Sequence, residues 1–174
     1  MLPSSLSERL SLHARHALKE ARDIARYTKS DTIEARHLIL ALALEEGSLG
    51  SILLENIGFK KEAVGKHCLR KLGTVKGKGA KAKKVLDLPL SVEVQNIMKR
   101  AFFLASEHGY PYVGTEHLMS ALLESPDAFI DTLIGTLKID DGKIDAIIES
   151  HLHFEQFPQM ARMFDTPDFD LSEG

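Results

Sequence analysis

The sequence has no tryptophan, a single cysteine and little net charge. Its 174 residues include one cysteine, Cys68, and the charged side chains sum to −3 at neutral pH. A single cysteine excludes an internal disulfide framework and is typical of a reducing compartment. A net charge so close to zero provides no global basic field that would hold the chain on nucleic acid or on a membrane surface.

Long hydrophobic stretches are absent as well. The longest unbroken apolar run, Leu38 to Leu44, is seven residues long, far short of the roughly 20 residues that a membrane-spanning helix needs. The start of the chain, MLPSSLSERL, lacks the basic region followed by an apolar stretch that marks a secretory signal. With an apolar share of 44%, these absences predict a soluble, cytoplasmic globular chain with no membrane partner.

The sequence does contain a helical pattern that runs from end to end. Apolar residues recur every three or four positions from Leu6 to Ile24, which predicts a long first helix. Ser5, followed three residues later by Glu8, resembles a capping box and predicts where this helix starts. Three further helices, each followed by a glycine, are expected at about residues 35–45, 49–57 and 60–72. Alternation with period two is too short to predict a sheet, so the expected fold class is all-α.

A shift of 80 residues superposes the chain on itself without a gap. The identical pairs include Ser11 with Ser91, Ala21 with Ala101, Ala25 with Ala105, His37 with His117, Leu38 with Leu118, Ala41 with Ala121, Leu42 with Leu122 and Leu53 with Leu133. The matches keep helical spacing, so we interpret the chain as a duplicated four-helix unit, eight helices related by a pseudo-twofold axis, rather than a solenoid. The second set of helices is expected at about residues 91–108, 115–124, 126–136 and 140–153. Ser125 is expected to cap the third of these, with Pro126 as its first residue.

Two segments fall outside the duplicated pattern. The stretch GTVKGKGAKAKKVLDLP, residues 73–89, contains three glycines and five lysines and has no apolar period, which predicts a mobile, solvated linker. After about Phe154 the chain becomes acidic and contains phenylalanine and proline, which is typical of a connecting tail or of a peptide that docks on the domain. The expected division is repeat one at 5–73, the linker at 74–89, repeat two at 90–154 and the tail at 155–174.

No motif for catalysis or metal binding accompanies this pattern. The lysine-rich linker lacks both the GxxxxGK[ST] sequence and the preceding strand of a phosphate-binding loop, so this chain is not expected to hydrolyse ATP. His13 and His16 lie three residues apart, but no further ligand stands at a metal-binding spacing. The equivalent positions of His37 and His117 favour packing and hydrogen bonding. Cys68 is interpreted as a buried thiol. We therefore expect no catalytic residue, no metal and no cofactor in this chain.

A family resemblance rests on the segment YVGTEHLMSALL, residues 112–123, and on its weaker echo TIEARHLILALA, residues 32–43. Within a duplicated helical frame around a charged linker, they resemble the Clp N-terminal (Clp R) repeat domain of Clp-type AAA+ unfoldases, and are most similar to its ClpC branch. The resemblance covers about residues 5–153. It implies a non-catalytic domain that selects substrate proteins and binds adaptor proteins, while an ATPase ring unfolds the client for a Clp peptidase. ATP and magnesium are then expected only in ATPase modules, to which the tail would lead.

The resemblance also implies a ligand site, because in the ClpC branch the equivalent helix starts hold phosphoarginine, a degradation tag. The matching residues of the second repeat are Val113, Gly114, Thr115 and Glu116. Thr115 is expected to cap the helix, and Glu116 to pair with the guanidinium while backbone N–H groups hold the phosphate. The alternative is that Glu116 only complements the helix dipole. In the first repeat the matching residues are Ile33, Glu34, Ala35 and Arg36. An arginine repels a guanidinium, so this copy is expected to be degenerate.

Two other functions stay open on the sequence alone. A free-standing helical interaction module would contain the same repeats without ATPase modules. A nucleic-acid-binding domain would use the five linker lysines, since neutralised phosphates release counterions. No aromatic residues are interleaved with these lysines to stack on bases, so nucleic acid is not the favoured partner.

Overall fold

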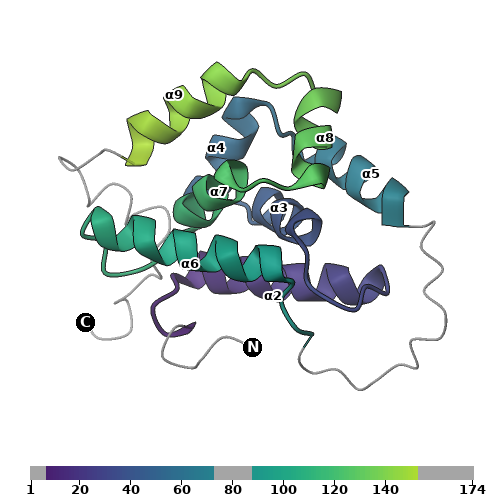
Figure 1. Cartoon of the computed structure of the whole chain (residues 1–174), viewed down its shortest axis with the longest axis horizontal. Coiled ribbons are helices and arrows are strands. Elements are labelled where there is room, and N and C mark those ends of the chain that lie inside the picture. Colours follow the sequence, from purple (N-terminus) through teal and green to yellow (C-terminus); the bar gives the residue numbers. More distant parts are fainter. Residues whose placement is uncertain (1–6, 73–87, 153–174) are drawn as a thin grey trace.

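The computed structural model describes residues 7–72 and 88–152, and that part of the chain folds into eight helices (Figure 1). The first repeat contributes α2 (Leu12–Tyr27), α3 (Ala35–Leu44), α4 (Leu49–Ile57) and α5 (Lys61–Leu72). The second repeat contributes α6 (Val92–Glu107), α7 (Thr115–Glu124), α8 (Ala128–Thr136) and α9 (Asp141–Leu152). The predicted all-α class is therefore confirmed. Most of the predicted linker and the whole of the predicted tail lie outside the described residues.

The duplication is confirmed by the helix bounds. α6 and α7 begin and end 80 residues after α2 and α3. A serine at the equivalent position caps α2 and α6. The side chain of Ser11 accepts the N–H of Ala14 at 3.1 Å, and the side chain of Ser91 accepts the N–H of Val94 at 3.2 Å. Such caps satisfy backbone donors that a helix start leaves without a partner.

The first helix starts later than the sequence pattern predicts. It begins at Leu12 with Ser11 as its cap. Ser5, the predicted cap, lies outside the described residues. The chain turns just before this point, and Leu10 forms a parallel bridge with Val113. The bonds of this bridge are made by the residues on either side of Leu10, Arg9 and Ser11, and hold Leu10 outside the helix. The apolar spacing that includes Leu10 therefore spans two different structures.

A second correction concerns the start of α8. This helix begins at Ala128, two residues after Pro126, and Ser125 is not its cap. The cap is Asp127, whose carboxylate accepts the N–H of Ile130 at 3.0 Å. A carboxylate at this position both accepts the bond and complements the positive end of the helix dipole.

The two repeats exchange backbone hydrogen bonds at symmetry-related points. Before α2, the N–H of Ser11 donates to the carbonyl of Val113 at 2.9 Å, and the N–H of Val113 donates to the carbonyl of Arg9 at 2.8 Å. Ile33 and Leu90 form the equivalent bridge, with bonds of 2.9 and 3.0 Å. Each repeat is thus tied to the other at the segments that lead into its helices.

The core lies around α3 and α7, in the middle of the molecule. α2 and α6 run along the lower side in Figure 1, and α4, α5, α8 and α9 lie above. α2 packs on α3 and α6 on α7, while α4 crosses to pack on α7. Small side chains allow the close packing of α2, whose fully buried residues include Ala14, Ala17, Ala21 and Ala25. No single helix of the described residues is long and apolar enough to cross a membrane; α3 and α4 qualify only together, and they meet at a bend of 103°.

Candidate functional site

The four residues predicted as the second-repeat ligand site are buried at the start of α7. Val113 and Thr115 are fully buried, and Glu116 is 3% exposed. The predicted capping role of Thr115 is wrong, because Gly114 occupies the cap position and Thr115 is already helical. The Thr115 hydroxyl instead accepts the N–H of Gly50, on α4 of the other repeat, at 2.8 Å. Glu116 does lie in the first turn of the helix.

A buried histidine, His117, also caps the start of α7 through a ring nitrogen. The N–H of Gly114 donates to Nδ1 of His117 at 2.9 Å, and in the first repeat the N–H of Glu34 donates to Nδ1 of His37 at the same distance. A ring nitrogen that accepts a bond carries no proton, so both imidazoles are neutral. Burial lowers the pKa of His117 to about 3 and the pKa of His37 to about 4, with smaller contributions from His108 and Arg36 respectively. The predicted packing and hydrogen-bonding role of these histidines is confirmed.

The neutral ring of His117 determines what kind of contact Glu116 makes with it. One carboxylate oxygen of Glu116 lies 3.3 Å from Nδ1 of His117. Because that nitrogen already accepts the N–H of Gly114, the contact is not an ion pair with a charged imidazole. The carboxylate therefore sits at the positive end of α7, where the helix dipole favours a negative charge.

The matching residues of the first repeat form a different arrangement. Ile33 and Ala35 are buried, and Glu34 occupies the cap position of α3. The guanidinium of Arg36 pairs with the carboxylate of Glu34. Two of the three departures from the GTEH sequence of the second repeat, Glu34 and Arg36, thus neutralise each other.

Cys68 lies next to this first-repeat arrangement. Its thiol is fully buried and lies 3.5 Å from the carbonyl of Arg36. Burial raises the pKa of the Cys68 thiol to about 12, which the nearby guanidinium only partly offsets. A thiol with so little thiolate at neutral pH is a poor nucleophile, which agrees with its interpretation as a structural residue.

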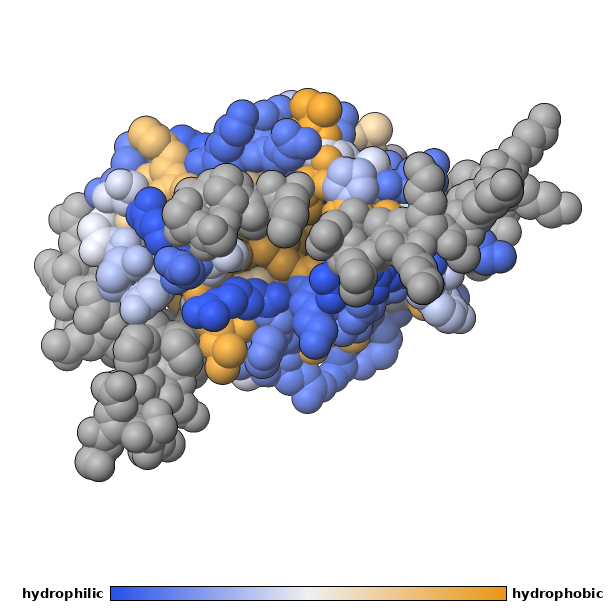
Figure 2. All heavy atoms as spheres, turned by 90° about the horizontal axis from the view of Figure 1, so that it is seen from below, coloured by the Kyte–Doolittle hydropathy of each residue, from blue (hydrophilic) through white to orange (hydrophobic). Residues whose placement is uncertain are grey.

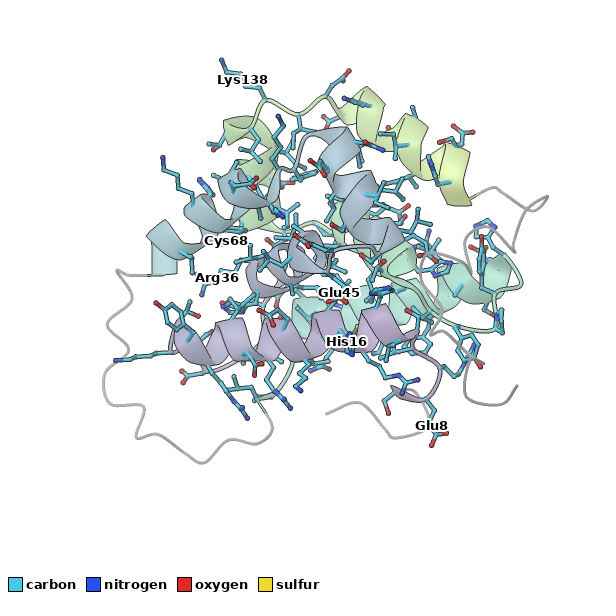
Figure 3. The ribbon with its side chains drawn as sticks, turned by 180° about the vertical axis from the view of Figure 1, so that it is seen from behind. Glu8, His16, Arg36, Glu45, Cys68 and Lys138 are labelled. Carbon is cyan, nitrogen blue, oxygen red and sulfur yellow. The ribbon has the colours of Figure 1, made fainter. Side chains whose placement is uncertain are left out.

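The two histidines of α2 approach an acid rather than a metal. Nδ1 of His13 lies 2.8 Å from Oε1 of Glu45, and Nδ1 of His16 lies 3.4 Å from the same oxygen. Figure 3 shows His16 on α2 beside Glu45 at the end of α3. Among residues 7–72 and 88–152, no group of three or more His, Cys, Asp or Glu side chains is placed to hold a metal ion.

An apolar strip lies on the lower side of the molecule. Figure 2 looks onto this side and shows apolar surface between two bands of polar residues. α2 and α6 are the helices on this side, so the strip runs between them. Leu18 of α2 and Phe102 of α6 are partly buried and pack against the core. The guanidinium of Arg9 lies 5.5 Å from the centre of the Phe102 ring, which places a cation at the edge of the strip.

Comparison with known families accounts for the duplicated frame. The profile of the Clp repeat (R) N-terminal domain matches residues 9–101 and again residues 89–161. The chain belongs to this family. The first match covers the first repeat and runs into α6, and the second covers the second repeat. Each repeat has a buried histidine, and the two bridges join the repeats to each other.

Relatives of this Clp repeat domain occur in chaperones. Chaperone protein ClpB of Nitratidesulfovibrio vulgaris is 32% identical over 120 residues, which is 67% of this chain, and the chain spans 14% of that protein's length. The N-terminal domain of the caseinolytic protease associated chaperone ClpD from Arabidopsis thaliana superposes with a TM-score of 0.67 at 17% identity, covering 87% of this chain and 99% of that one. The N-terminal domain of the ClpV1 ATPase from E. coli superposes with a TM-score of 0.62 at 18% identity, covering 95% and 94%. These two structures share the fold; assignment to the ClpC branch stays a prediction.

Sequence reasoning missed two features of this Clp repeat domain. The first is the close contact of Gly50 with Thr115, which joins residues 65 positions apart and carries no local pattern. The second is the apolar strip, because helical spacing identifies the apolar face of each helix but not a gap between two helices. The position of Phe102 was a signal for the strip, since the equivalent residue in the first repeat is Arg22.

Proposed function

We propose that this Clp repeat domain recognises substrate and adaptor proteins for an ATP-dependent Clp-type unfoldase of the cytoplasm. The observation that carries the proposal is the apolar strip between α2 and α6, with polar residues on both sides. Unfolded segments expose apolar side chains, and an exposed apolar surface rimmed by polar residues is typical of a protein-binding site. The relatives support the setting, because their names describe chaperones and an ATPase. ATP, magnesium and the Clp peptidase would then act on the parent protein rather than on this domain.

The strip suits weak, repeated contacts with many different segments. Burying one large apolar side chain contributes about 1.5–3 kcal/mol, and ordering an unfolded segment offsets part of that gain. A recognition domain that must release its client to an unfoldase benefits from such modest affinity. Specificity then depends on which charged groups border the strip.

Shortening Phe102 is expected to weaken client binding. The Phe102→Ala variant should bind a fluorescently labelled, permanently unfolded protein about tenfold less tightly than the wild type, because the strip loses an apolar contact. The measurement is fluorescence anisotropy on the full chain. Phe103→Ala is the matched control: Phe103 is the next residue along α6, is half exposed and lies beside Arg100. Its affinity should stay within about twofold of the wild type.

Equal losses in the two phenylalanine variants would contradict the strip as the binding site. Absence of any binding by the wild type would contradict the recognition function itself. Because Phe102 packs against the core, thermal melts followed by circular dichroism must show that the variant is folded at the assay temperature.

The finer proposal is that the start of α7 binds phosphoarginine through Glu116. The carboxylate in the first turn supports pairing with a guanidinium. Because the Thr115 hydroxyl accepts the N–H of Gly50, the phosphate can reach this helix start only if α4 moves away from α7. The first repeat is a weaker candidate for this ligand, because its Glu34 carboxylate already pairs with Arg36.

Calorimetry with free phosphoarginine tests this finer proposal. Glu116→Gln should weaken binding by about tenfold to a hundredfold, the effect of losing a charge-assisted hydrogen bond, and Arg36→Glu should strengthen binding by restoring a carboxylate in the first repeat. Loss of affinity in Arg36→Glu, or no heat with the wild type at saturating ligand, would contradict phosphoarginine as a ligand. Neither result would affect the proposed role of the strip.

Two alternatives are separated by other observations. A free-standing interaction module would use the same strip, and the presence or absence of a phosphate-binding loop encoded beyond Gly174 distinguishes it from an unfoldase domain. A nucleic-acid role would depend on the lysine-rich linker, which lies almost entirely outside the described residues. Salt-dependent retention on immobilised DNA would favour that role.

A further inference from the structure

α2 and α6 occupy equivalent places in the two repeats but differ in charge. On α2 and in the turn that follows it, basic residues recur at intervals of four, three, four and three: Arg15, Lys19, Arg22, Arg26 and Lys29. Residues three and four apart lie on the same face of a helix. We call these five residues the basic stripe. Figure 3 shows nitrogen-tipped side chains projecting from the lower side of α2, which is the side that Figure 2 looks onto.

The duplicated helix does not repeat the basic stripe. The residues 80 positions later are Gln95, Lys99, Phe102, Ser106 and Gly109, so only Lys99 keeps its charge. Arg100, the other cation of this region of α6, belongs to a different face and pairs with Glu124 at 3.1 Å. The α2 border of the apolar strip therefore has five basic residues, whereas the α6 border has Lys99 and, against Phe102, the guanidinium of Arg9.

Acidic side chains of the described residues pair only weakly with the basic stripe. Asp23 lies 3.9 Å from Nε of Arg22 and 4.0 Å from Nη1 of Arg26, at the outer limit of an ion pair. Both pairs are substantially exposed, where such contacts contribute little. Helical spacing places Glu20 on a different face of α2. Among the described residues, Arg15, Lys19 and Lys29 form no ion pair, so positive charge remains along the helix.

The basic stripe borders the apolar strip. Leu18 stands three residues after Arg15 and four before Arg22, so helical geometry places it beside them. Leu18 also packs against the core. An apolar residue packed on Leu18 therefore brings its neighbours in the segment close to the basic stripe.

We propose that the basic stripe docks acidic segments of the proteins that this domain recognises, while apolar side chains of the same segment occupy the strip. This proposal rests on the proposed function and names the class of segment that is preferred: extended, acidic and interspersed with apolar residues. We choose an acidic peptide segment as the ligand because its charge is complementary to that of the basic stripe. The chain as a whole has a net charge of −3, which disfavours a long polyanion such as nucleic acid but leaves a short acidic segment in contact with the basic stripe alone.

Two labelled peptides test the preference on the full chain. They share their phenylalanines and differ in carrying aspartate or lysine at the remaining charged positions. At about 50 mM salt, where the Debye length still exceeds 10 Å, fluorescence anisotropy should show the aspartate peptide binding about tenfold more tightly. The difference should shrink strongly at about 500 mM salt, because surface charges are then screened. Equal affinities at low salt would overturn the proposal.

The duplication offers a matched pair of variants. Lys19→Glu alters the basic stripe, and Lys99→Glu makes the same change at the equivalent position of α6. Lys19→Glu should weaken binding of the aspartate peptide about fivefold to tenfold at low salt, and Lys99→Glu less than about twofold. Both lysines are exposed, so neither change is expected to unfold the domain. Equal losses in the two variants would overturn the basic stripe as the docking site.

Other occupants are distinguishable in the same assay. If the aspartate peptide binds only after residues 154–174 are removed, the basic stripe belongs to the chain's own acidic end, and the proposal of a partner segment is overturned. If a single-stranded oligonucleotide binds as tightly as the aspartate peptide and is also lost in Lys19→Glu, a peptide preference is overturned. Failure of the proposed function would give a different result. Neither peptide nor the unfolded protein would bind to the wild type, so the Phe102→Ala variant could not lower any affinity.

Discussion

Acidification from pH 7 to pH 5 is expected to remove about 4 kcal/mol from the free energy of unfolding of this domain, about 2 kcal/mol for each of two buried histidines. His37 and His117 stay neutral in the folded state, with pKa values lowered from 6.5 to about 4 and about 3. In the unfolded chain both take up protons as the pH falls below 6.5. The stability they contribute is therefore fully present above that pH and is lost progressively below it.

The physical cause is the hydrogen bond at each helix start. Nδ1 of each ring accepts a backbone N–H, and a protonated ring cannot accept it. Protonation would also place a charge in a buried site, which costs far more than the bond itself. The pH dependence and the helix cap are thus two effects of the same nitrogen atom.

Urea unfolding at pH 7, 6 and 5, followed by circular dichroism, measures this loss. In the double variant His37→Gln with His117→Gln the amide oxygen can still accept the N–H but does not titrate, so the loss between pH 7 and 5 should fall below about 1 kcal/mol. A full loss in the double variant would show that other groups cause the acid sensitivity.

Gly50→Ala is expected to destabilise the domain by about 2–4 kcal/mol, although alanine is normally the better helix former by about 1 kcal/mol. A Cβ atom at this position would lie 2.8 Å from Cβ and Oγ1 of Thr115 and 2.9 Å from its carbonyl carbon. The carbonyl carbon is backbone and cannot rotate away, so α4 has to move from α7. That movement also lengthens the hydrogen bond from the Gly50 N–H to the Thr115 hydroxyl.

A second helical glycine provides the control. Gly135 lies in α8, and a Cβ atom there would meet nothing within 4 Å. Gly135→Ala should therefore stabilise the domain by about 0.5–1 kcal/mol. Opposite signs for the two substitutions in thermal and urea melts are the expected result. A Gly50→Ala protein as stable as the wild type would mean that α4 and α7 are not held as closely as the structure describes.

The helices with clear local signals were predictable from the sequence. α4 ends where Gly58 was expected to end it, and this glycine adopts a φ of 124°, which favours a residue without a side chain. The duplication was equally readable, because the spacing of 80 residues is preserved in α6 and α7. These features depend on residues close together in the chain or on identity between its halves.

What could not be predicted depends on contacts between the halves. Leu10 fits the apolar period of the first helix, but its partner Val113 in the second repeat holds it in an extended bridge. Thr115 has the residue type of a helix cap, but its hydroxyl is taken by Gly50. The predicted ligand residues were placed correctly at the start of α7, whereas their burial follows from the packing of α4 against α7. Local pattern alone cannot distinguish an exposed helix start from one covered by another repeat.

The paired bridges also bear on how such a fold can arise. A chain with one repeat would leave the backbone groups of the segment at residue 33 without a partner, and two identical copies related by a twofold axis would satisfy them reciprocally. The present chain makes these bonds within one molecule, as a symmetric dimer would after gene fusion. Once joined, the two halves no longer need to be identical, because each position has to suit only one environment. Arg36 in one half and Glu116 in the other stand at equivalent positions with opposite charge, and a homodimer encoded by one gene could not hold that difference.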